Sequence, residues 1–410
     1  MLRLLIENTL DREDYEMAEW IEKTLCEVTA FITKGIPPKY VDKENQDTVC
    51  VLNQKCNRNF EISYVESRLH NMSLKKVPSE KMLHAGDVLI NSTGTGTAGR
   101  VAQIFEVPVP TTIDGHMILI RPTDEIDTLY YGYAIKGYQK KIESLAEGST
   151  GQTEINRQRL QDEIIIRFPK DKHIQKSIGI FLLRIDEKIK NNEQINNNLE
   201  QQAKALYKDW FFDFTPFSTD GNLPDGWRLG TVSDIIQLHD SKRVPLSGAE
   251  RDKMAKIYPY YGATSLMDYV DNYLFDGIYL LLGEDGTVVD SLGFPILQYV
   301  YGQFWVNNHA HIITGKEGFS VEELYLFFSL TNIKSIVTGA VQQKVSQQNL
   351  KKVPAIIPSK DVLSAFDELI QPIFSQIRNL RDENASLADL RDTLLPKLMS
   401  GELDVSDIDL

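Results

Sequence analysis

The chain has 410 residues and a formal net charge of −14 at pH 7, which leaves room for two to four domains with more than one core. The acidic excess argues against a protein that binds nucleic acid unaided over a broad basic surface, because phosphate contacts need Lys and Arg. Any DNA binding must therefore be local or shared with a partner.

The cysteines and the hydropathy restrict the chemistry and the compartment. Cys26, Cys50 and Cys56 show neither the paired spacing of a zinc site nor a disulfide pattern, so we expect free or buried thiols and no metal. The sequence has no run of about 18 apolar residues, and its first residues turn acidic too early for a signal peptide. We expect a soluble protein of the cytoplasm that does not contact the membrane.

The first part of the chain is predicted to hold a helix and a globular domain. Residues 1–17 are rich in Leu, Ile and Glu and indicate a short amphipathic helix. Over residues 18–169, short β-branched runs alternate with Gly, Pro and Asn, which are strand and turn signals. Residues 127–146 have helical character, so this first domain is predicted to be mixed α/β.

A GxGxxG pattern occurs in this domain at Gly94, Gly96 and Gly99. In a dinucleotide-binding fold the pattern would open a helix, but here a β-like run follows it. We therefore predict a turn or hairpin loop. The small polar residues of this loop are candidates for contacts with a phosphate or a base edge: Ser92, Thr93, Thr95 and Thr97.

The rest of the chain is predicted to be a long helix, a second domain and a second long helix. The first helix covers residues 170–214, and a linker rich in Pro, Gly and Asp follows its aromatic end. The second globular domain covers residues 215–358 and the second helix residues 359–403. Residues 404–410 form a tail.

Each long helix carries a heptad stripe, and the stripe beginning at Ile178 recurs 188 residues later at Phe366. An ordinary amphipathic helix could carry such a stripe, but the first one spans about 48 Å, longer than a compact domain usually needs. We predict an intramolecular coiled coil. Its predicted core positions are Ile178, Leu182, Ile185, Ile189, Asn192, Leu199, Leu206, Ile370, Ile373, Ile377, Leu380, Asn384, Leu387 and Leu394.

The register of the coiled coil can also be predicted. In an antiparallel alignment, facing positions have numbers that add to 576, which places Asn192 opposite Asn384 as a polar layer. Pro372 and Pro396 lie within the second stripe and are expected to kink that helix or delay its start. Arg391 occupies a core position, where it could extend its charged end to solvent or mark a partner contact.

The two globular domains repeat one order of elements. Trp20 corresponds to Trp227, and each is followed four residues later by Thr and then an apolar residue. The glycine loop, the helix near Tyr131 and the polar segment before each long helix recur in the same order. The predicted fold class is therefore α+β, with two mixed α/β domains separated by two long helices that form an antiparallel coiled coil in a pseudo-twofold repeat.

A polar loop before each long helix concentrates side chains that can contact base edges. Asn and Gln can pair with adenine in a bidentate way, and Arg with guanine. A solvated loop is the alternative, but recurrence in both copies favours function. The candidates are Gln152, Thr153, Asn156, Arg157 and Arg159 in the first copy and Gln342, Gln343, Lys344, Gln347 and Gln348 in the second.

No catalytic residues are predicted. His116 and His311 occupy roughly equivalent places in the two copies, beside Asp114 and Asn308. No nucleophile or acid recurs beside them, so a structural or recognition role is expected rather than general base chemistry.

Three stretches resemble the specificity subunit of type I restriction-modification systems. They are LRDTLLPKLMSGEL from Leu390 to Leu403, LEQQAKALYKDWFFDF from Leu199 to Phe214, and LPDGWRLGTVSDI from Leu223 to Ile235. The resemblance covers essentially the whole chain, as a target recognition domain, a conserved helix, a second target recognition domain and a second conserved helix.

The resemblance implies a DNA-specificity subunit without catalytic activity. Each target recognition domain would recognise one half of a bipartite asymmetric site in double-stranded DNA, while the helices set the spacer and dock two methylase subunits. No cofactor would bind this chain: S-adenosylmethionine belongs to the methylase, and ATP and Mg²⁺ belong to the restriction and translocase subunits. Such partners would supply the cationic surface that this acidic chain lacks.

Two other functions remain open at this stage. A free-standing bipartite DNA-binding regulator should be more basic, locally or overall. A coiled-coil scaffold with two protein-binding ends would tolerate alanine in the Gln-rich loops. The sequence specifies neither the DNA target nor whether the complex cleaves DNA.

Overall fold

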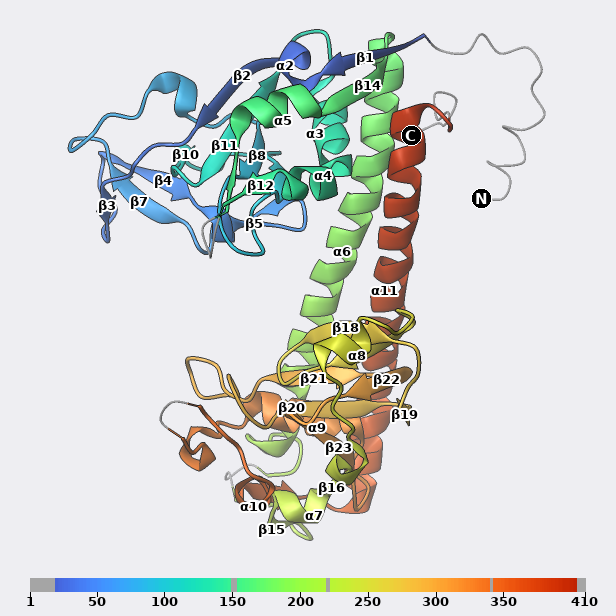
Figure 1. Ribbon diagram of the computed structural model, residues 1–410. Coiled ribbons are helices and arrows are strands. Elements are labelled where there is room, and N and C mark those ends of the chain that lie inside the picture. The colour runs from blue at the N-terminus through green and yellow to red at the C-terminus, as the bar shows by residue number, and fades with distance from the viewer. Residues whose placement is uncertain (1–18, 149–152, 219–221, 340–341, 404–410) are drawn as a thin grey trace. The chain divides into compact units, whose positions relative to one another are not determined.

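The computed structural model describes residues 19–148, 153–218, 222–339 and 342–403. Two compact units make up the chain, residues 1–190 with 384–410 and residues 191–383. Each unit holds one mixed α/β globular domain and part of each of two long helices, α6 (Lys172–Phe211) and α11 (Lys360–Ser400) (Figure 1). The helix predicted over residues 1–17, Gln152 and the tail 404–410 lie outside the described residues.

The first globular domain contains two four-stranded sheets and several short strand pairs. The central sheet is antiparallel, in the order β2 (Thr29–Lys34), β11 (Met117–Pro122), β8 (Val88–Asn91) and β9 (Val101–Gln103). The second sheet has the order β10 (Thr111–Ile113), β4 (Thr48–Leu52), β7 (Arg68–Asn71) and β3 (Tyr40–Val41). The pairs are β1 (Trp20–Thr24) with β14 (Ile165–Pro169), β5 (Asn57–Arg58) with β6 (Glu61–Ile62), and β12 (Ala146–Glu147) with β13 (Glu154–Ile155).

The central sheet of this domain is buried on both faces, which explains its continuous apolar runs. On β8, Val88 and Ile90 join a core with α3 (Thr128–Gly137) and the long helices. Leu89 belongs to a second core, shared with Leu52 of the other sheet. The remaining helices are α2 (Leu25–Val28), α4 (Gln139–Ser144) and α5 (Arg157–Glu163).

The second globular domain repeats the central sheet and the strand pair at the long helix, while its other sheet has a different strand order. Its central sheet has the order β16 (Ile236–Leu238), β23 (Ala310–Gly315), β20 (Tyr279–Gly283) and β21 (Leu297–Val300). The other sheet has the order β18 (Leu266–Val270), β17 (Tyr258–Tyr261), β22 (Gln303–Val306) and β19 (Phe275–Asp276), and β15 (Arg228–Thr231) pairs with β24 (Pro354–Ile357). The helices are α7 (Val232–Ile235), α8 (Gly248–Arg251), α9 (Val321–Leu330) and α10 (Gln347–Leu350).

Local signals at the start of each domain explain why the repeat was visible in the sequence. Thr24 caps α2 in a capping box with Glu27, and Thr231 forms the same box on α7 with Asp234. The strand before each cap pairs antiparallel with the strand that leads into the long helix. The predicted correspondence of Trp20 with Trp227 therefore marks the same strand–cap–helix unit in both domains.

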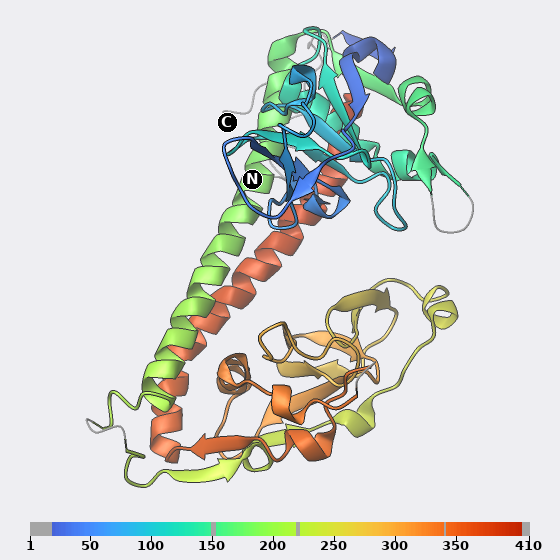
Figure 2. The same ribbon diagram turned by 90° about the vertical axis from the view of Figure 1, so that its left-hand side faces the viewer.

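The segments of the two long helices run antiparallel within each unit, as predicted (Figure 2). In the first unit, the Arg391 guanidinium lies 2.6 Å from Asp186 Oδ1, and the Asn384 amide donates to the Ile189 carbonyl at 3.2 Å. In the second unit, the rings of Trp210 and Phe366 lie 5.2 Å apart. Residues further along α6 thus contact residues earlier in α11, and the two residue numbers in each contact add up to nearly 576, as predicted.

Every predicted core position of the coiled coil is buried or half-buried. Asn192 is fully buried and donates to Glu383 Oε2 at 2.8 Å. Its predicted pairing with Asn384 stays a prediction. The globular domains share these cores, because Ile178 and Leu182 pack with the first domain, and Ile370 and Ile377 with the second.

Two expectations about the second helix are revised. It begins at Lys360 and continues through Pro372 and Pro396, so neither proline delays its start. Both prolines are exposed, and water can therefore satisfy the carbonyls that they leave without an N–H partner. Arg391 does not extend freely to solvent, since its side chain is only 17% exposed and pairs with Asp186.

The described residues include all three cysteines and both long helices. Cys50 and Cys56 are buried and Cys26 is exposed, and all three are free thiols. Burial raises the pKa of the Cys50 and Cys56 thiols. Among the described residues, no helix is both long enough and apolar enough to cross a membrane. The predicted domain boundaries stay a prediction.

Candidate nucleic-acid interface

Three segments of the first domain meet at one end of its central sheet. They are the loop after β8, the turn before β11 and the segment that leads into α5. The Ser92 N–H donates to the His116 carbonyl at 2.9 Å, and the Ile155 N–H donates to the Ser92 carbonyl at 2.8 Å. These backbone bonds hold the predicted loop residues and the predicted polar segment together as one surface.

The second domain builds the same surface with different side chains. The Glu284 N–H donates to the His309 carbonyl at 2.8 Å, and the Val345 N–H donates to the Glu284 carbonyl at 2.8 Å. The bridge between Thr93 and Glu154 in the first domain recurs between Asp285 and Lys344. Backbone pairing therefore matches Ser92 with Glu284, Thr93 with Asp285, Glu154 with Lys344 and Ile155 with Val345.

The predicted correspondence of His116 with His311 is wrong. Met117 pairs with Asn91 at the end of β8, and Ala310 pairs with Gly283 at the end of β20, so His116 matches His309. Each of these histidines directly precedes the central strand. The His116 N–H donates to Asp114 Oδ1 at 2.9 Å, and the His309 N–H donates to Asn307 Oδ1 at 2.8 Å. Sequence spacing missed this because loop lengths differ between the copies, whereas strand pairing fixes the match.

The glycine loop is a hairpin loop between β8 and β9, as predicted. Gly94, Gly96 and Gly99 have φ of +106°, +71° and +89°, a region that glycine adopts most easily. A side chain at Gly99 would also meet the backbone of Glu143 at 2.6 Å. The glycines thus shape the loop, and no helix follows them to bind a pyrophosphate.

The predicted polar residues of the glycine loop divide into supporting and presented side chains. Ser92 is fully buried. Thr93 and Thr97 are half-buried and both contact the Gln54 amide, at 2.6 Å and 3.4 Å. Thr95 is exposed at the tip. A base-contacting role of these residues stays a prediction, and Thr95 is the best placed for it.

In the polar segment of the first domain, two predicted residues have structural partners. Asn156 is the N-cap of α5 and accepts the N–H of Gln158 at 2.9 Å. Arg159 forms ion pairs with Glu147 and Glu163. Thr153 is half-buried, and Arg157 is exposed at the first position of α5. Of these residues, Arg157 is the one most open to a ligand.

Arg157 lines an open cavity of about 710 Å³ together with Lys34, which sequence reasoning missed. Partial burial and the nearby charge of Arg157 lower the pKa of Lys34. Lys34 forms an ion pair with Glu154, and both residues line the cavity. The other residues of the lining are Ile32, Glu147, Ile155, Asn156, Gln158 and Gln161. The cavity combines two cations, the carboxylates of Glu147 and Glu154, and amide groups, a set that can form directed hydrogen bonds to base edges.

In the polar segment of the second domain, Gln342, Gln343 and Gln348 are exposed. Lys344 is also exposed and lies 3.4 Å from Glu284 Oε1. Gln347 is half-buried, and its amide donates to Asp240 Oδ2 at 2.6 Å. The exposed glutamines remain candidates for base contacts, whereas Gln347 has an internal partner.

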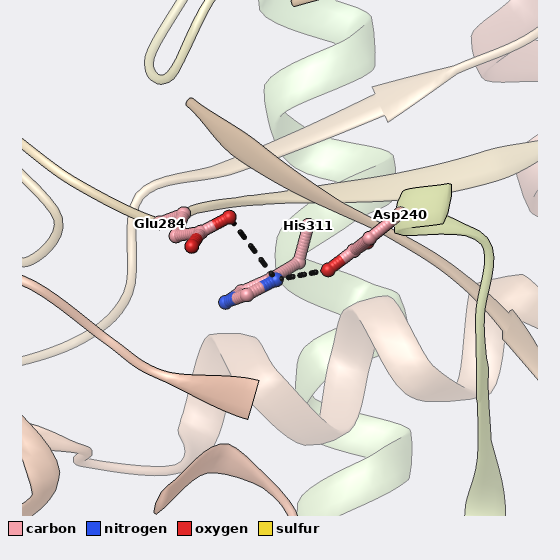
Figure 3. A group of neighbouring side chains, drawn as sticks. All are labelled: Asp240, Glu284 and His311. Carbon is pink, nitrogen blue, oxygen red and sulfur yellow. Dashed lines mark hydrogen bonds and ion pairs between the residues drawn. The ribbon is translucent and has the colours of Figure 1, made fainter. Parts of the chain in front are cut away.

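Beneath this segment lies a buried charge cluster of Asp240, Glu284 and His311 (Figure 3). His311 Nδ1 lies 2.6 Å from Asp240 Oδ2 and 3.8 Å from Glu284 Oε2, and its Nε2 lies 2.8 Å from the Val345 carbonyl. Burial opposes the ionisation of Asp240, but the hydrogen bond from His311 holds the pKa of this carboxyl below its usual value. Both ring nitrogens of His311 thus have oxygen partners inside the protein.

The three side chains have ligand atoms within 4.8 Å of one another, which could suit a cation. Protein donors already occupy them, however. Arg243 donates to Glu284 Oε2 at 2.6 Å, and the Ile312 N–H donates to Asp240 Oδ1 at 2.9 Å. Arg243 and His311 both face the two carboxylates, so the cluster is better described as a polar network that anchors the loop at Val345 than as a metal centre.

The network also shows how far the two copies have diverged. By strand pairing, Lys34 matches Asp240 and Ile118 matches His311. By the same pairing, Glu154 matches Lys344, so an acid and a base stand in exchanged positions in the two copies. The partners differ too, because Lys34 pairs with Glu154, whereas Lys344 lies beside Glu284. These residues lie far apart in the chain, so local sequence patterns do not reveal the exchange.

A second cavity, of about 340 Å³, opens beside His309 in the second domain. Asp285 and Asn307 line it, and the Nδ1 of His309 lies 2.6 Å from Asp285 Oδ1. Its remaining lining comes from the turn between β17 and β18, namely Gly262, Ala263, Thr264, Ser265 and Met267. Carboxylate, amide and imidazole groups converge here, as expected of a surface that forms directed hydrogen bonds.

A repeated pair of mixed α/β domains, each presenting a polar surface and joined to antiparallel long helices, is the architecture of a two-part recognition protein. Residues 17–201 and 224–387 both match the family model of the type I restriction modification DNA specificity domain. The chain belongs to this family.

Individual relatives agree with this assignment. The chain is 27% identical over 382 residues to the type I restriction enzyme MjaIX specificity subunit of Methanocaldococcus jannaschii, covering 85% of each chain. It is 24% identical over 313 residues to the type I restriction enzyme HindI specificity subunit of Haemophilus influenzae, covering 57% of this chain and 68% of the relative. The fold resembles the crystal structure of the type I restriction-modification S subunit from M. genitalium, with a TM-score of 0.54, 17% identity, and coverage of 94% of this chain and 98% of that one.

Proposed function

We propose that this chain is the DNA-specificity subunit of a type I restriction-modification complex, in which each globular domain recognises one half of a bipartite asymmetric site. The observation that carries the proposal is the surface that occurs in both domains on one backbone frame with different side chains. A protein that recognises two different sequences requires such a change of side chains on a common scaffold. Family membership supports the same function.

The chemistry of the first surface suits duplex DNA. Arg157 is an exposed cation at the start of α5, and Lys34 lies in the same cavity, so both can contact phosphate or guanine. Thr95 and His116 are exposed beside them on the adjoining segments. Phosphate contacts would position the domain, and the directed hydrogen bonds of the neutral side chains would select bases.

The second surface carries different side-chain groups from the first. His309 and Asp285 lie at a cavity, and Gln342 and Gln343 are exposed on the neighbouring segment. Carboxylates accept hydrogen bonds from cytosine N4, and Gln pairs with adenine. Lys344, exposed on the same segment, would contact phosphate, while the glutamines would contact bases.

The acidic net charge is consistent with work in a complex rather than alone. A chain with a formal charge of −14 needs cationic partners to hold DNA at physiological salt. We propose two methylase subunits as these partners, docked on the long helices, with restriction and translocase subunits joining them. S-adenosylmethionine would bind in the methylase, and ATP with Mg²⁺ in the restriction subunit, so this chain would act without catalysis.

We propose further that α6 and α11 set the unrecognised spacer of the DNA site. Deleting one heptad from both helices shortens them by about 10 Å at 1.5 Å per residue, or about three base pairs. We expect the spacer to shorten while both half-sites stay the same. A variant complex that methylates altered half-sites with the original spacer would contradict this role of the helices.

The first test of the function is methylation mapping. The chain is expressed with the methylase subunit encoded beside it, and methylated adenines are located by long-read sequencing. We expect a two-part motif with a fixed gap that disappears when this chain is omitted. A stable complex that methylates no motif would favour a protein scaffold, and specific DNA binding by the chain without the methylase would favour a free-standing regulator.

A further inference from the structure

One histidine occupies the same backbone position in each domain, directly before the central strand. His116 is exposed, and the side chain of His309 is 46% exposed. In both domains the ring nitrogen Nδ1 faces the side chain at the start of the adjoining loop, which is Thr93 in the first domain and Asp285 in the second. The two copies therefore differ at the side chain that faces Nδ1 and so influences which ring nitrogen carries the hydrogen.

In the first domain, a hydrogen bond from Gln54 favours one direction for the contact between Thr93 and His116. The Gln54 amide nitrogen donates to Thr93 Oγ1 at 2.6 Å, so the hydroxyl oxygen already serves as an acceptor. Its single hydrogen is free to be donated to His116 Nδ1, 3.0 Å away. When Nδ1 of a neutral imidazole accepts, Nε2 carries the hydrogen. His116 thus presents a hydrogen-bond donor to its surroundings.

In the second domain the direction is reversed. An ionised carboxylate can only accept, so His309 Nδ1 donates to Asp285 Oδ1 across the 2.6 Å that separate them. The neutral ring then has its lone pair on Nε2. His309 in this form presents a hydrogen-bond acceptor from the position at which His116 presents a donor.

We propose that His116 and His309 are specificity-determining residues of opposite hydrogen-bond polarity, and that Thr93 and Asp285 set this polarity. His116 would donate to an acceptor on a base edge, such as guanine O6 or N7 or thymine O4. His309 would accept from an exocyclic amine, the N4 of cytosine or the N6 of adenine. This inference rests on the proposed function, because it names the residues that choose a base within each half-site.

The position of these residues supports base contact rather than a purely structural role. The His309 ring lines the open cavity of the second domain together with Asp285 and Asn307. His116 adjoins the start of the glycine loop, since its carbonyl accepts the Ser92 N–H, and the Ser92 carbonyl accepts the Ile155 N–H of the segment that carries Arg157. By contrast, His311 is fully buried, with both nitrogens bound inside the protein, so it cannot contact DNA.

The experiment exchanges the two controlling residues in the assembled complex. Asp285→Thr and Thr93→Asp are prepared separately, each is co-expressed with the methylase, and the methylated motif is mapped. We expect Asp285→Thr to change the preferred base at one position of one half-site, from cytosine or adenine, whose exocyclic amine donates, to guanine or thymine, whose O6 or O4 accepts. Thr93→Asp should cause the opposite change in the other half-site. Asp252→Thr, which removes an exposed carboxylate of the second domain, is the matched control and should leave the motif unchanged.

Alanine variants decide the case if an exchange variant does not assemble. His309→Ala and His116→Ala remove only side chains that reach the surface, and each should lower discrimination at one position by on the order of ten-fold. An unchanged motif in the exchange or alanine variants, with methylation intact, would overturn the inference while leaving the proposed function standing. A wild-type complex that methylates no bipartite motif would instead overturn the proposed function.

A spectroscopic readout tests the polarity itself. Full-length chain labelled with ¹⁵N-histidine gives nitrogen shifts that distinguish the two imidazole tautomers. We expect the Nε2–H form at His116 and the Nδ1–H form at His309, with the His309 signal changing to the other form in Asp285→Thr. If the two histidines have the same tautomer when their imidazole rings are neutral, the proposed difference is overturned.

Discussion

The buried carboxyl of Glu323 makes the stability of the second unit depend on pH. Glu323 is fully buried on α9, where its Oε2 accepts the N–H of Ser320 at 2.8 Å in a capping box. Its Oε1 has no hydrogen-bond partner among the described residues. The pKa of Glu323 is raised to about 8, mainly by burial and in part by the nearby charge of Asp367, while the Ser320 N–H opposes the rise. Glu323→Gln keeps an oxygen for the cap and removes the ionisation.

The sign and size of the effect follow from proton linkage. Between pH 4.5 and about 8 the folded state keeps the proton that the unfolded state releases, so the free energy of unfolding falls as pH rises. Each pH unit costs 1.36 kcal/mol, and pH 7 lies 2.5 units above 4.5, so the cost at pH 7 is about 3 kcal/mol. Glutamine does not ionise and avoids this cost. The variant should therefore match the wild type near pH 4.5 and exceed it by about 3 kcal/mol at pH 7.

Urea unfolding at a series of pH values measures this difference. Three of the four tryptophans, Trp210, Trp227 and Trp305, belong to the second unit, so fluorescence reports mainly on its unfolding. Glu368→Gln alters an exposed glutamate of α11 in the same unit and should not change the pH dependence. A Glu323→Gln variant whose advantage over the wild type is the same at pH 5 and pH 7 would refute the reasoning, because a pH-independent gain cannot come from ionisation.

Two further changes test the packing of the first unit. Arg391→Ala leaves Asp186 without its 2.6 Å partner on the opposite helix and should lower the unfolding free energy by about 1–3 kcal/mol. The loss should be smaller when Asp186 is already replaced by Asn. Equal losses in both backgrounds would show that the two side chains are not coupled. Gly99→Ala should lower the melting temperature more than Gly96→Ala: both have positive φ, but only Gly99 would bring a Cβ within 2.6 Å of the Glu143 backbone. Equal decreases in melting temperature for the two variants would show that the contact with Glu143 adds nothing to the effect of backbone conformation.

Much of the fold was predictable because it is encoded in short windows of sequence. The heptad stripe from Ile178 depends only on residues a few positions apart, and it predicted a helix that the structure places at Lys172–Phe211. Capping residues such as Thr24 and Thr231 mark helix starts by local hydrogen bonds. The family resemblance added the DNA-recognition function, which neither periodicity nor capping could indicate.

The recognition surface was predictable only in part. The glycine loop and the polar segments were found in the sequence, and their backbones do come together in each domain. Their individual roles were not predictable, because composition does not show which polar side chain has an internal partner. Asn156 caps α5, and Arg159 pairs with Glu147 and Glu163, while Arg157 between them faces a cavity.

The sequence by itself determined the repeat and the two long helices, since periodicity and local caps act over a few residues. Only the tertiary structure decided that His116 matches His309 rather than His311, and that Asp240, Glu284 and His311 form one network. The physical reason is that loop lengths differ between the copies, so spacing along the chain does not preserve position. Backbone hydrogen bonds between distant strands fix that position, and they exist only in the folded protein.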